Sequence, residues 1–202
     1  MQRLGPEAVL LVASLCVSGR AFAWPTGIGI FSQEDASPWH RCFTVPAFAP
    51  TSLYVIGFEL GSFHGWEASV TFDSAAFTIV AVILNPAEAT NVGGIGNFIV
   101  GLGANFDGSP RYTLVTYQFG WFAGPVPPQD SQVCLGGTTP SSFGGAPGYA
   151  TAQSQLVVLP FVSLQTGLYD EGCAVLNPTD LANCAFSYPI FEASFGGLKA
   201  RF

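Results

Sequence analysis

The chain has 202 residues, of which 49% are hydrophobic, 14% aromatic and only 9% charged. This proportion of apolar side chains supports a packed core and excludes a disordered chain, and the length fits a single domain. The net charge of −7 excludes a cationic surface that neutralises the phosphates of nucleic acid. The 24 glycines and 15 prolines, together with a scarcity of strong helix formers, indicate an all-β fold.

Residues 1–23 have the features of a secretory signal peptide. Arg3 precedes the apolar run 8–17, and the run is followed by the A-x-A sequence at 21–23. We expect cleavage before Trp24, which leaves residues 24–202 as one acidic, exported domain. An apolar run of about ten residues is too short for a membrane-spanning helix, which needs about 20. The sequence therefore predicts no membrane span after cleavage, and localisation outside the cell, at the cell surface or in the periplasm.

Period-two alternation recurs along the mature chain and predicts strands. In 65–73, Trp66, Ala68, Val70 and Phe72 fall on one face and polar residues on the other, which is typical of a half-buried strand. The run 77–84 is apolar on both faces and predicts a central strand. The full set of predicted strands is 27–31, 42–45, 51–60, 65–73, 77–84, 98–102, 112–121, 155–164, 173–176 and 186–195. About nine short strands without a crossover helix predict an antiparallel β-sandwich.

Residues 123–150 contain five prolines and six glycines and predict a long loop. Its function stays open between a simple connection of the two sheets and a binding loop.

Four cysteines remain in the mature chain, and an even number in an exported chain predicts disulfide bonds. They are Cys42, Cys134, Cys173 and Cys184. Three pairings are open, and we favour Cys42–Cys134 together with Cys173–Cys184, because Asn177-Pro178 indicates a chain reversal within the second pair. A zinc site is the alternative, but there is no CxxC and no histidine at ligand spacing.

Residues suited to catalysis are few. The histidines are His40 and His64, and His64 is expected in a surface turn. No G-x-S-x-G motif marks a serine nucleophile. A glycosidase needs two nearby carboxylates, and Glu59 on a neighbouring strand is the one candidate to face Glu67. We therefore expect no catalytic residues and no cofactor, with a glycan-acting hydrolase kept as the alternative.

Calcium is the one cofactor with any candidate ligands in the sequence. The acidic residues expected in loops are Glu34, Asp35, Asp107, Asp170 and Glu171, but they do not form a regular calcium-binding pattern.

An aromatic run ends the predicted strand 112–121. At strand spacing, Tyr117, Phe119 and Trp121 share one face. If that face is exposed, it is a flat platform for a sugar ring or a protein partner; if it is buried, it is core. These three residues are the predicted ligand-binding residues.

Several segments resemble a group of uncharacterised secreted β-sandwich proteins of bacteria. The matches, in chain order, are GIGIF, Cys42, VPAFAPTSLYV at 45–55, VILNPAEAT at 82–90 and LVTY at 114–117. The ending SFGGLKARF is similar to the basic and aromatic tail of that group, and it implies a sorting signal at 192–202. The group more distantly resembles cohesin modules. The resemblance implies a β-sandwich fold and export, and it carries over no recognition residue.

These observations together favour a non-catalytic binding or structural module. The expected ligand is an extracellular glycan or a surface protein, and nucleic acid is not expected. An outer-membrane β-barrel is a further alternative because the chain ends in phenylalanine, although Pro189 and the paired cysteines fit a barrel poorly.

Overall fold

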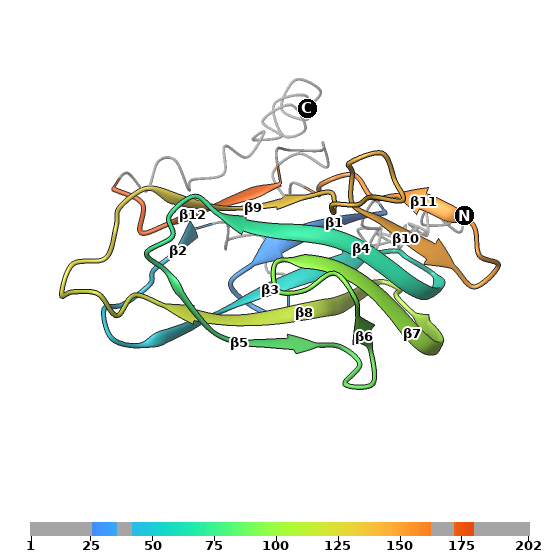
Figure 1. The fold of residues 1–202 in the computed structure, drawn as a ribbon, viewed down its shortest axis with the longest axis horizontal. Helices are drawn as coiled ribbons and strands as arrows, with labels where there is room; N and C mark the ends of the chain where they lie inside the picture. The colour runs from blue at the N-terminus through green and yellow to red at the C-terminus, as the bar shows by residue number, and fades with distance from the viewer. Residues whose placement is uncertain (1–25, 36–41, 163–171, 180–202) are drawn as a thin grey trace, which may run out of the picture.

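The computed structural model describes residues 26–35, 42–162 and 172–179. In this part the chain forms twelve strands and no helix, arranged as two sheets that pack face to face (Figure 1). The strands are β1 (Gly27–Phe31), β2 (Cys42–Phe43), β3 (Pro50–Phe58), β4 (Ser62–Phe72), β5 (Thr78–Leu84), β6 (Thr90–Asn91), β7 (Asn97–Asp107), β8 (Arg111–Gly120), β9 (Ser131–Gly136), β10 (Gly148–Thr151), β11 (Leu156–Val158) and β12 (Cys173–Leu176). The predicted all-β sandwich is confirmed.

The first sheet has four strands in the order β1-β3-β8-β5, all antiparallel. Its β1 edge is covered by the segment around Phe161, which runs parallel to β1. The N–H of Ile28 donates to the carbonyl of Pro160 at 3.0 Å, and the N–H of Val162 donates to the carbonyl of Ile28 at 2.8 Å. The strand β5 forms the opposite edge, so the prediction of a central strand at 77–84 is wrong. The run is apolar on both faces although only one face packs on the core.

The second sheet is built around the eleven-residue strand β4. One edge of β4 pairs with β7, and the other pairs with β10 over its first half and with β9 over its second half. The strands β11, β12, β6 and β2 extend this sheet, and β2 runs parallel to β12. Because β3 and β4 lie in different sheets, they are not the neighbouring strands that were expected to bring Glu59 opposite Glu67.

Aromatic rings from the two sheets meet in the core. Phe98 of β7 lies edge-on to Tyr117 of β8, with ring centroids 5.7 Å apart, and Phe72 of β4 lies 5.0 Å from Phe119 of β8. The predicted inward face of β4 is confirmed, since Trp66, Ala68 and Val70 are all buried. A smaller cluster of Phe31, Ile56 and Phe58 lies on the other face of the first sheet. Alternation along β3 thus feeds two clusters rather than one.

The predicted loop 123–150 contains a strand and the start of another. Residues Ser131–Gly136 form β9, which pairs with β4 on one side and with β12 on the other, and β10 begins at Gly148. The connection between β9 and β10, residues 137–147, remains a loop. It leaves the sheet and returns to the same edge of β4, so it is placed to cover the outer face of β4.

A disulfide bond joins Cys134 of β9 to Cys173 of β12, which are directly opposite each other in the antiparallel ladder. The predicted pairs Cys42–Cys134 and Cys173–Cys184 are therefore wrong. Cys42 is also disulfide-bonded. Cys184, His40, the signal peptide and the tail at 192–202 lie outside the described residues. Among the residues that the structure does describe, no helix has the length and apolar character needed to cross a membrane.

Candidate functional site

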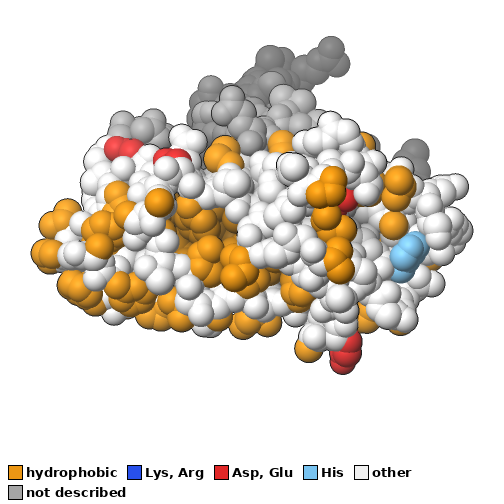
Figure 2. Space-filling view, in the orientation of Figure 1, with side chains coloured by type: hydrophobic (Ala, Val, Ile, Leu, Met, Phe, Trp, Pro, Cys, Tyr) orange, Lys and Arg blue, Asp and Glu red, His pale blue; other side chains and the backbone are white. Residues whose placement is uncertain are grey.

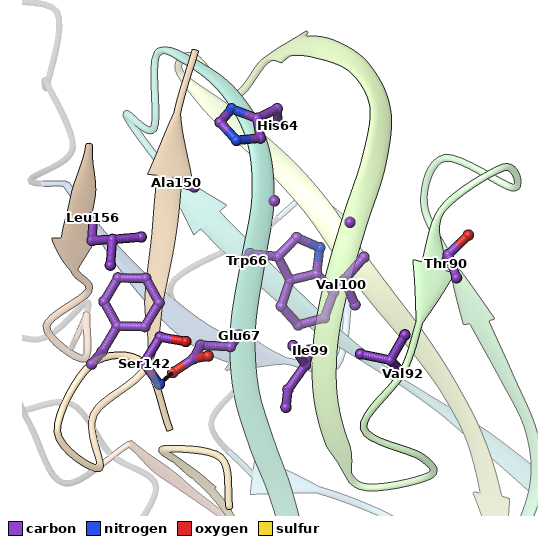
Figure 3. Close-up of a pocket in the computed structure, with 13 residues that line it drawn as sticks. His64, Trp66, Glu67, Thr90, Val92, Ile99, Val100, Ser142, Ala150 and Leu156 are labelled. Carbon is purple, nitrogen blue, oxygen red and sulfur yellow. Dashed lines mark hydrogen bonds between the residues drawn. The ribbon is translucent and has the colours of Figure 1, made fainter. Parts of the chain in front are cut away.

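A groove of about 420 Å³ lies on the outer face of the second sheet (Figure 3). Its base is formed where β7, β4 and β10 run side by side, and β6 and β11 flank it. The groove faces away from the inter-sheet core, so its shape depends on the outward side chains of these strands and on the loop 137–147.

The floor of the groove consists of small residues. Gly65 of β4 is paired with Gly101 of β7 on one side and with Ala150 of β10 on the other. A Cβ atom added at Gly101 would meet no atom within 4 Å, which shows that this position opens into free space. Three adjacent strands thus present almost bare main chain. A trough results, because a side chain at Gly101 would fill this space, whereas a Cβ at Gly65 would lie 2.9 Å from the carbonyl oxygen of Val100.

The walls are apolar. Ile99 and Val92 border the floor on the β7 side, and Phe143 and Leu156 border it on the β10 side. Val92 is 76% exposed and Leu156 is 61% exposed. Figure 2 shows hydrophobic side chains gathered in a band on this part of the surface. Apolar side chains this exposed on both sides of a trough are typical of an interaction site.

Two polar side chains of β4, His64 and Glu67, flank the floor, and Figure 3 shows Glu67 pointing at Ser142. Glu67 is only 3% exposed although it lies on the outer face of the sheet. Its Oε1 accepts a 2.9 Å hydrogen bond from the Ser141 hydroxyl and a 2.7 Å bond from the Ser142 N–H. These bonds compensate for burying the carboxylate, and they fix the loop 137–147 against the sheet.

The same loop places an aromatic ring beside the groove. The Ser141 hydroxyl oxygen accepts hydrogen bonds from the N–H groups of Phe143 and Gly145, both at 3.0 Å. The Phe143 ring then packs on Gly148 so closely that a Cβ there would lie 2.3 Å from the ring. The position of this wall therefore depends on Glu67 below and on the absence of a side chain at Gly148.

Trp66 belongs both to the core and to the lining of the groove. Its side chain is 3% exposed, and its indole N–H has no hydrogen-bond partner among the described residues. Leaving a buried donor unpaired costs about 1–3 kcal/mol, so the packing of this ring against Phe98 has to outweigh that cost.

The electrostatics of the described surface are one-sided. Arg111 is the one basic residue of the described ranges, against eight carboxylates, and its guanidinium donates to the main-chain carbonyl of Asp35. The groove itself contains a single carboxylate, Glu67, which is already hydrogen-bonded. Its chemistry therefore suits an uncharged ligand in the trough, within an overall negative surrounding.

The sequence-predicted binding residues are not in this groove. Tyr117 and Phe119 are fully buried between the sheets, and Trp121 is half-buried against the same core. Burial raises the pKa of the Tyr117 phenol, and a nearby main-chain group of Gly96 opposes this increase. The three residues do share a face, as predicted, but that face is core, so the exposed platform is a wrong expectation. The alternation along this strand was predicted correctly, but the sequence did not show whether the aromatic face points to the core or to solvent.

The other side chains that were considered for catalysis or metal binding do not lie together. Glu59 lies in the turn between β3 and β4 with φ of 50°, not on a strand facing Glu67. His64 lies in β4, half-buried, rather than in a turn. Within the described ranges, no group of three or more histidine, cysteine, aspartate or glutamate side chains is placed to hold a metal ion. The groove thus provides shape and apolar contact rather than a set of reacting groups.

Comparison with known proteins places the chain beside one kind of module. No family model and no curated protein matches the sequence. Among solved structures, the sixth cohesin of scaffoldin B from Acetivibrio cellulolyticus, crystallised with a dockerin mutant, matches with a TM-score of 0.48 at 12% identity, over 76% of this chain and 98% of that one. The cohesin module of a family 33 glycoside hydrolase from Clostridium perfringens matches with a TM-score of 0.44 at 10% identity, over 76% and 99%. The cohesin of a cohesin–dockerin complex from Clostridium thermocellum matches with a TM-score of 0.41 at 9% identity, over 76% and 96%. The chain is thus similar to cohesin modules at very low identity, and no binding residue is transferred from them.

Proposed function

We propose that this protein is a non-catalytic binding module, and that the groove on its second sheet takes an extended, uncharged segment of a partner protein. The observation that carries the proposal is the floor of Gly65, Gly101 and Ala150 between apolar walls. A main chain in extended conformation fits a trough of this kind, with its apolar side chains directed at the walls.

The composition of the groove and the charge around it favour this kind of partner. Binding sites are concave, mostly apolar and carry few polar groups, and the groove has this composition. The described surface around it is acidic, with Arg111 as its one basic residue. Charge complementarity therefore favours a partner in which lysine or arginine flanks the uncharged segment that lies in the groove. A strongly acidic partner is disfavoured for the same reason.

The test is a selection of peptides on the folded protein. A displayed library of random linear peptides is selected on the wild-type chain, and binders are then measured against Gly101→Val. At Gly101 a side chain enters free space, so this variant fills the trough without a clash. We expect the selected peptides to be apolar with basic flanks, and to lose at least about tenfold in affinity for the variant, or about 1.4 kcal/mol.

The matched control is Gly103→Val. Gly103 lies on the same strand, and a Cβ there also meets nothing within 4 Å, but it does not line the groove. Peptides that bind both variants as well as the wild type would contradict the proposal. A glycan array is run in parallel; glycan binding that only Gly101→Val abolishes would assign the groove to a carbohydrate instead.

We further propose that the protein is exported, with 1–23 as a cleaved signal peptide and 24–202 as the mature chain. The disulfide-bonded state of Cys42, Cys134 and Cys173 supports this, because such bonds persist in oxidising compartments. Mass spectrometry of the protein recovered from cells tests it: a mature N-terminus at Trp24 is expected, and an intact N-terminus with free thiols would contradict it. A sorting function for 192–202 stays a prediction, tested by deleting the tail and following surface retention.

A further inference from the structure

The strand β5 has an edge that nothing in the described part of the chain covers. It pairs with β8 on one side and forms the end of the first sheet on the other. The opposite end of the same sheet is covered, because residues 160–162 bond to β1. In Figure 1, β5 lies along the lower border of the molecule, and Figure 2 shows hydrophobic side chains along that border.

The composition of this edge is unusual. Residues 78–84 read TIVAVIL, without a charge or a proline, and Val80 is 53% exposed and Ile83 51% exposed. Natural sheets protect their edges with charges, prolines, β-bulges or very short strands, because an exposed edge pairs with other chains. Two ends of the second sheet follow this rule, since β11 has three residues and β2 has two. At seven residues, β5 has one such feature, a register shift between Ile79 and Ala81, and residues 81–84 beyond it continue without a charge, a proline or a further irregularity.

The main chain of β5 also presents hydrogen-bonding groups outward. The N–H of Asn85 donates to the carbonyl of Leu114 in β8 at 3.1 Å. Because main-chain groups of successive residues alternate in direction along a strand, the N–H and C=O of Leu84 and Val82 point away from β8. Their side chains meanwhile pack on the core. The outer edge therefore offers the groups that an added antiparallel strand needs.

We propose that β5 is a dimerisation strand, which pairs with β5 of a second copy in antiparallel orientation and joins the two first sheets into one. Charge selects this occupant. The described surface has seven carboxylates, because Glu67 is buried, and one arginine, so two copies repel each other wherever carboxylates meet, but β5 contains no charge. Antiparallel pairing of this strand with itself brings no charges together and places the apolar side chains of 79–84 opposite one another, and it generates the two-fold symmetry of most dimers.

The dimer is expected to be concentration-dependent. Seven residues from each copy are fewer than the roughly 20–30 residues a side of a standard interface. The surface is also separate from the groove, because none of the β5 residues lines it. The inference therefore goes beyond the proposed function, and either one stands if the other fails.

Sedimentation velocity of the chain over a wide concentration range tests the proposal. We expect the wild type to shift from monomer to dimer as concentration rises, and the double variant Val80→Lys, Ile83→Lys to remain monomeric, because lysine on an edge blocks strand addition. The matched control is Val158→Lys. Val158 is 52% exposed on the edge strand β11, and its variant is expected to dimerise like the wild type.

Hydrogen exchange of the Val82 and Leu84 amides distinguishes pairing of β5 with a second copy from pairing with another segment of the same chain. Protection that appears only at concentrations where the dimer forms supports the proposal. Protection that is already complete in the monomer would overturn it, since another segment of the chain would then cover the edge. A wild type that stays monomeric throughout, or a double variant that still dimerises, would overturn it as well. Circular dichroism and thermal melting confirm that each variant is folded.

Discussion

The main-chain N–H of Ser142 donates a 2.7 Å hydrogen bond to Oε1 of Glu67, across a separation of 75 residues. This bond ties the loop 137–147 to the centre of β4, and the Ser141 hydroxyl donates to the same oxygen. One buried carboxylate thus determines where the Phe143 wall of the groove lies.

Replacing Glu67 with alanine should release this loop. Hydrogen bonds to a charged group contribute roughly 1.5–3 kcal/mol, so we expect the free energy of unfolding to fall by about 2 kcal/mol. Hydrogen exchange should show amides of 141–145 losing protection, while those of β9 keep it. Glu67→Gln is the matched control, because its amide oxygen still accepts both bonds, without the charge, and it should lose less. Equal loop protection in the alanine variant and the wild type would rule out the carboxylate as the anchor.

The Tyr117 side chain is fully buried, and its hydroxyl lies near the main chain of Gly96 without a hydrogen bond of normal geometry. Removing an unpaired buried hydroxyl relieves a desolvation cost, so Tyr117→Phe should leave the free energy of unfolding unchanged or raise it by about 1 kcal/mol. Tyr117→Ala should lower it by about 4 kcal/mol, because a large cavity remains beside Phe72 and Phe98. Urea denaturation measures both. A phenylalanine variant as unstable as the alanine variant would show that the hydroxyl is required.

The sequence predicted the strands whose residues carry a local signal. The bounds of β1 and β12 and the inward face of β4 follow from alternation within a single strand, and all three are confirmed. The strand β9 was missed because SQVCLG lies among prolines and glycines, and its strand conformation depends on pairing with β4 and β12. Tertiary contacts override local composition there.

The groove was not predictable, because it depends on register between strands. Gly65, Gly101 and Ala150 are ordinary small residues in the sequence, and only strand pairing places them side by side. Glycine inside a strand is the one signal that was available, since it often marks a close approach of another chain. The disulfide pairing was not predictable for the same reason, because Cys134 and Cys173 are opposite each other only in the observed register of β9 and β12.

Removing the bond between Cys134 and Cys173 should cost a large part of the stability. The two residues are separated by 39 positions, and a loop of that length restricts the unfolded chain by about 4 kcal/mol in the chain-entropy treatment. The double variant Cys134→Ala, Cys173→Ala is expected to unfold at correspondingly lower urea. Gln132→Ala, on the same strand β9, controls for a side-chain change without loss of the bond. If the double variant loses no more stability than this control, the cross-link does not stabilise the fold.

Asp130 should make the junction between the start of β9 and the end of β12 sensitive to acid. Its Oδ1 accepts a 2.8 Å bond from the Thr179 N–H, and its Oδ2 accepts a 2.6 Å bond from the Thr179 hydroxyl. These bonds lower the pKa of the Asp130 carboxyl below its ordinary value of 3.8. A group whose pKa is lowered by folding stabilises the folded state fully above its ordinary pKa, and this contribution is lost as the pH falls through the folded value.

A double-mutant cycle of Asp130→Asn and Thr179→Val, followed by urea denaturation, should therefore give a coupling energy at pH 7 that decreases when the pH falls well below 3.8. Asparagine keeps the shape of the side chain and tolerates the positive φ of 51° at this position, so backbone strain does not enter the comparison. A coupling energy that is the same at both pH values would show that the ionised carboxylate is not what Thr179 binds.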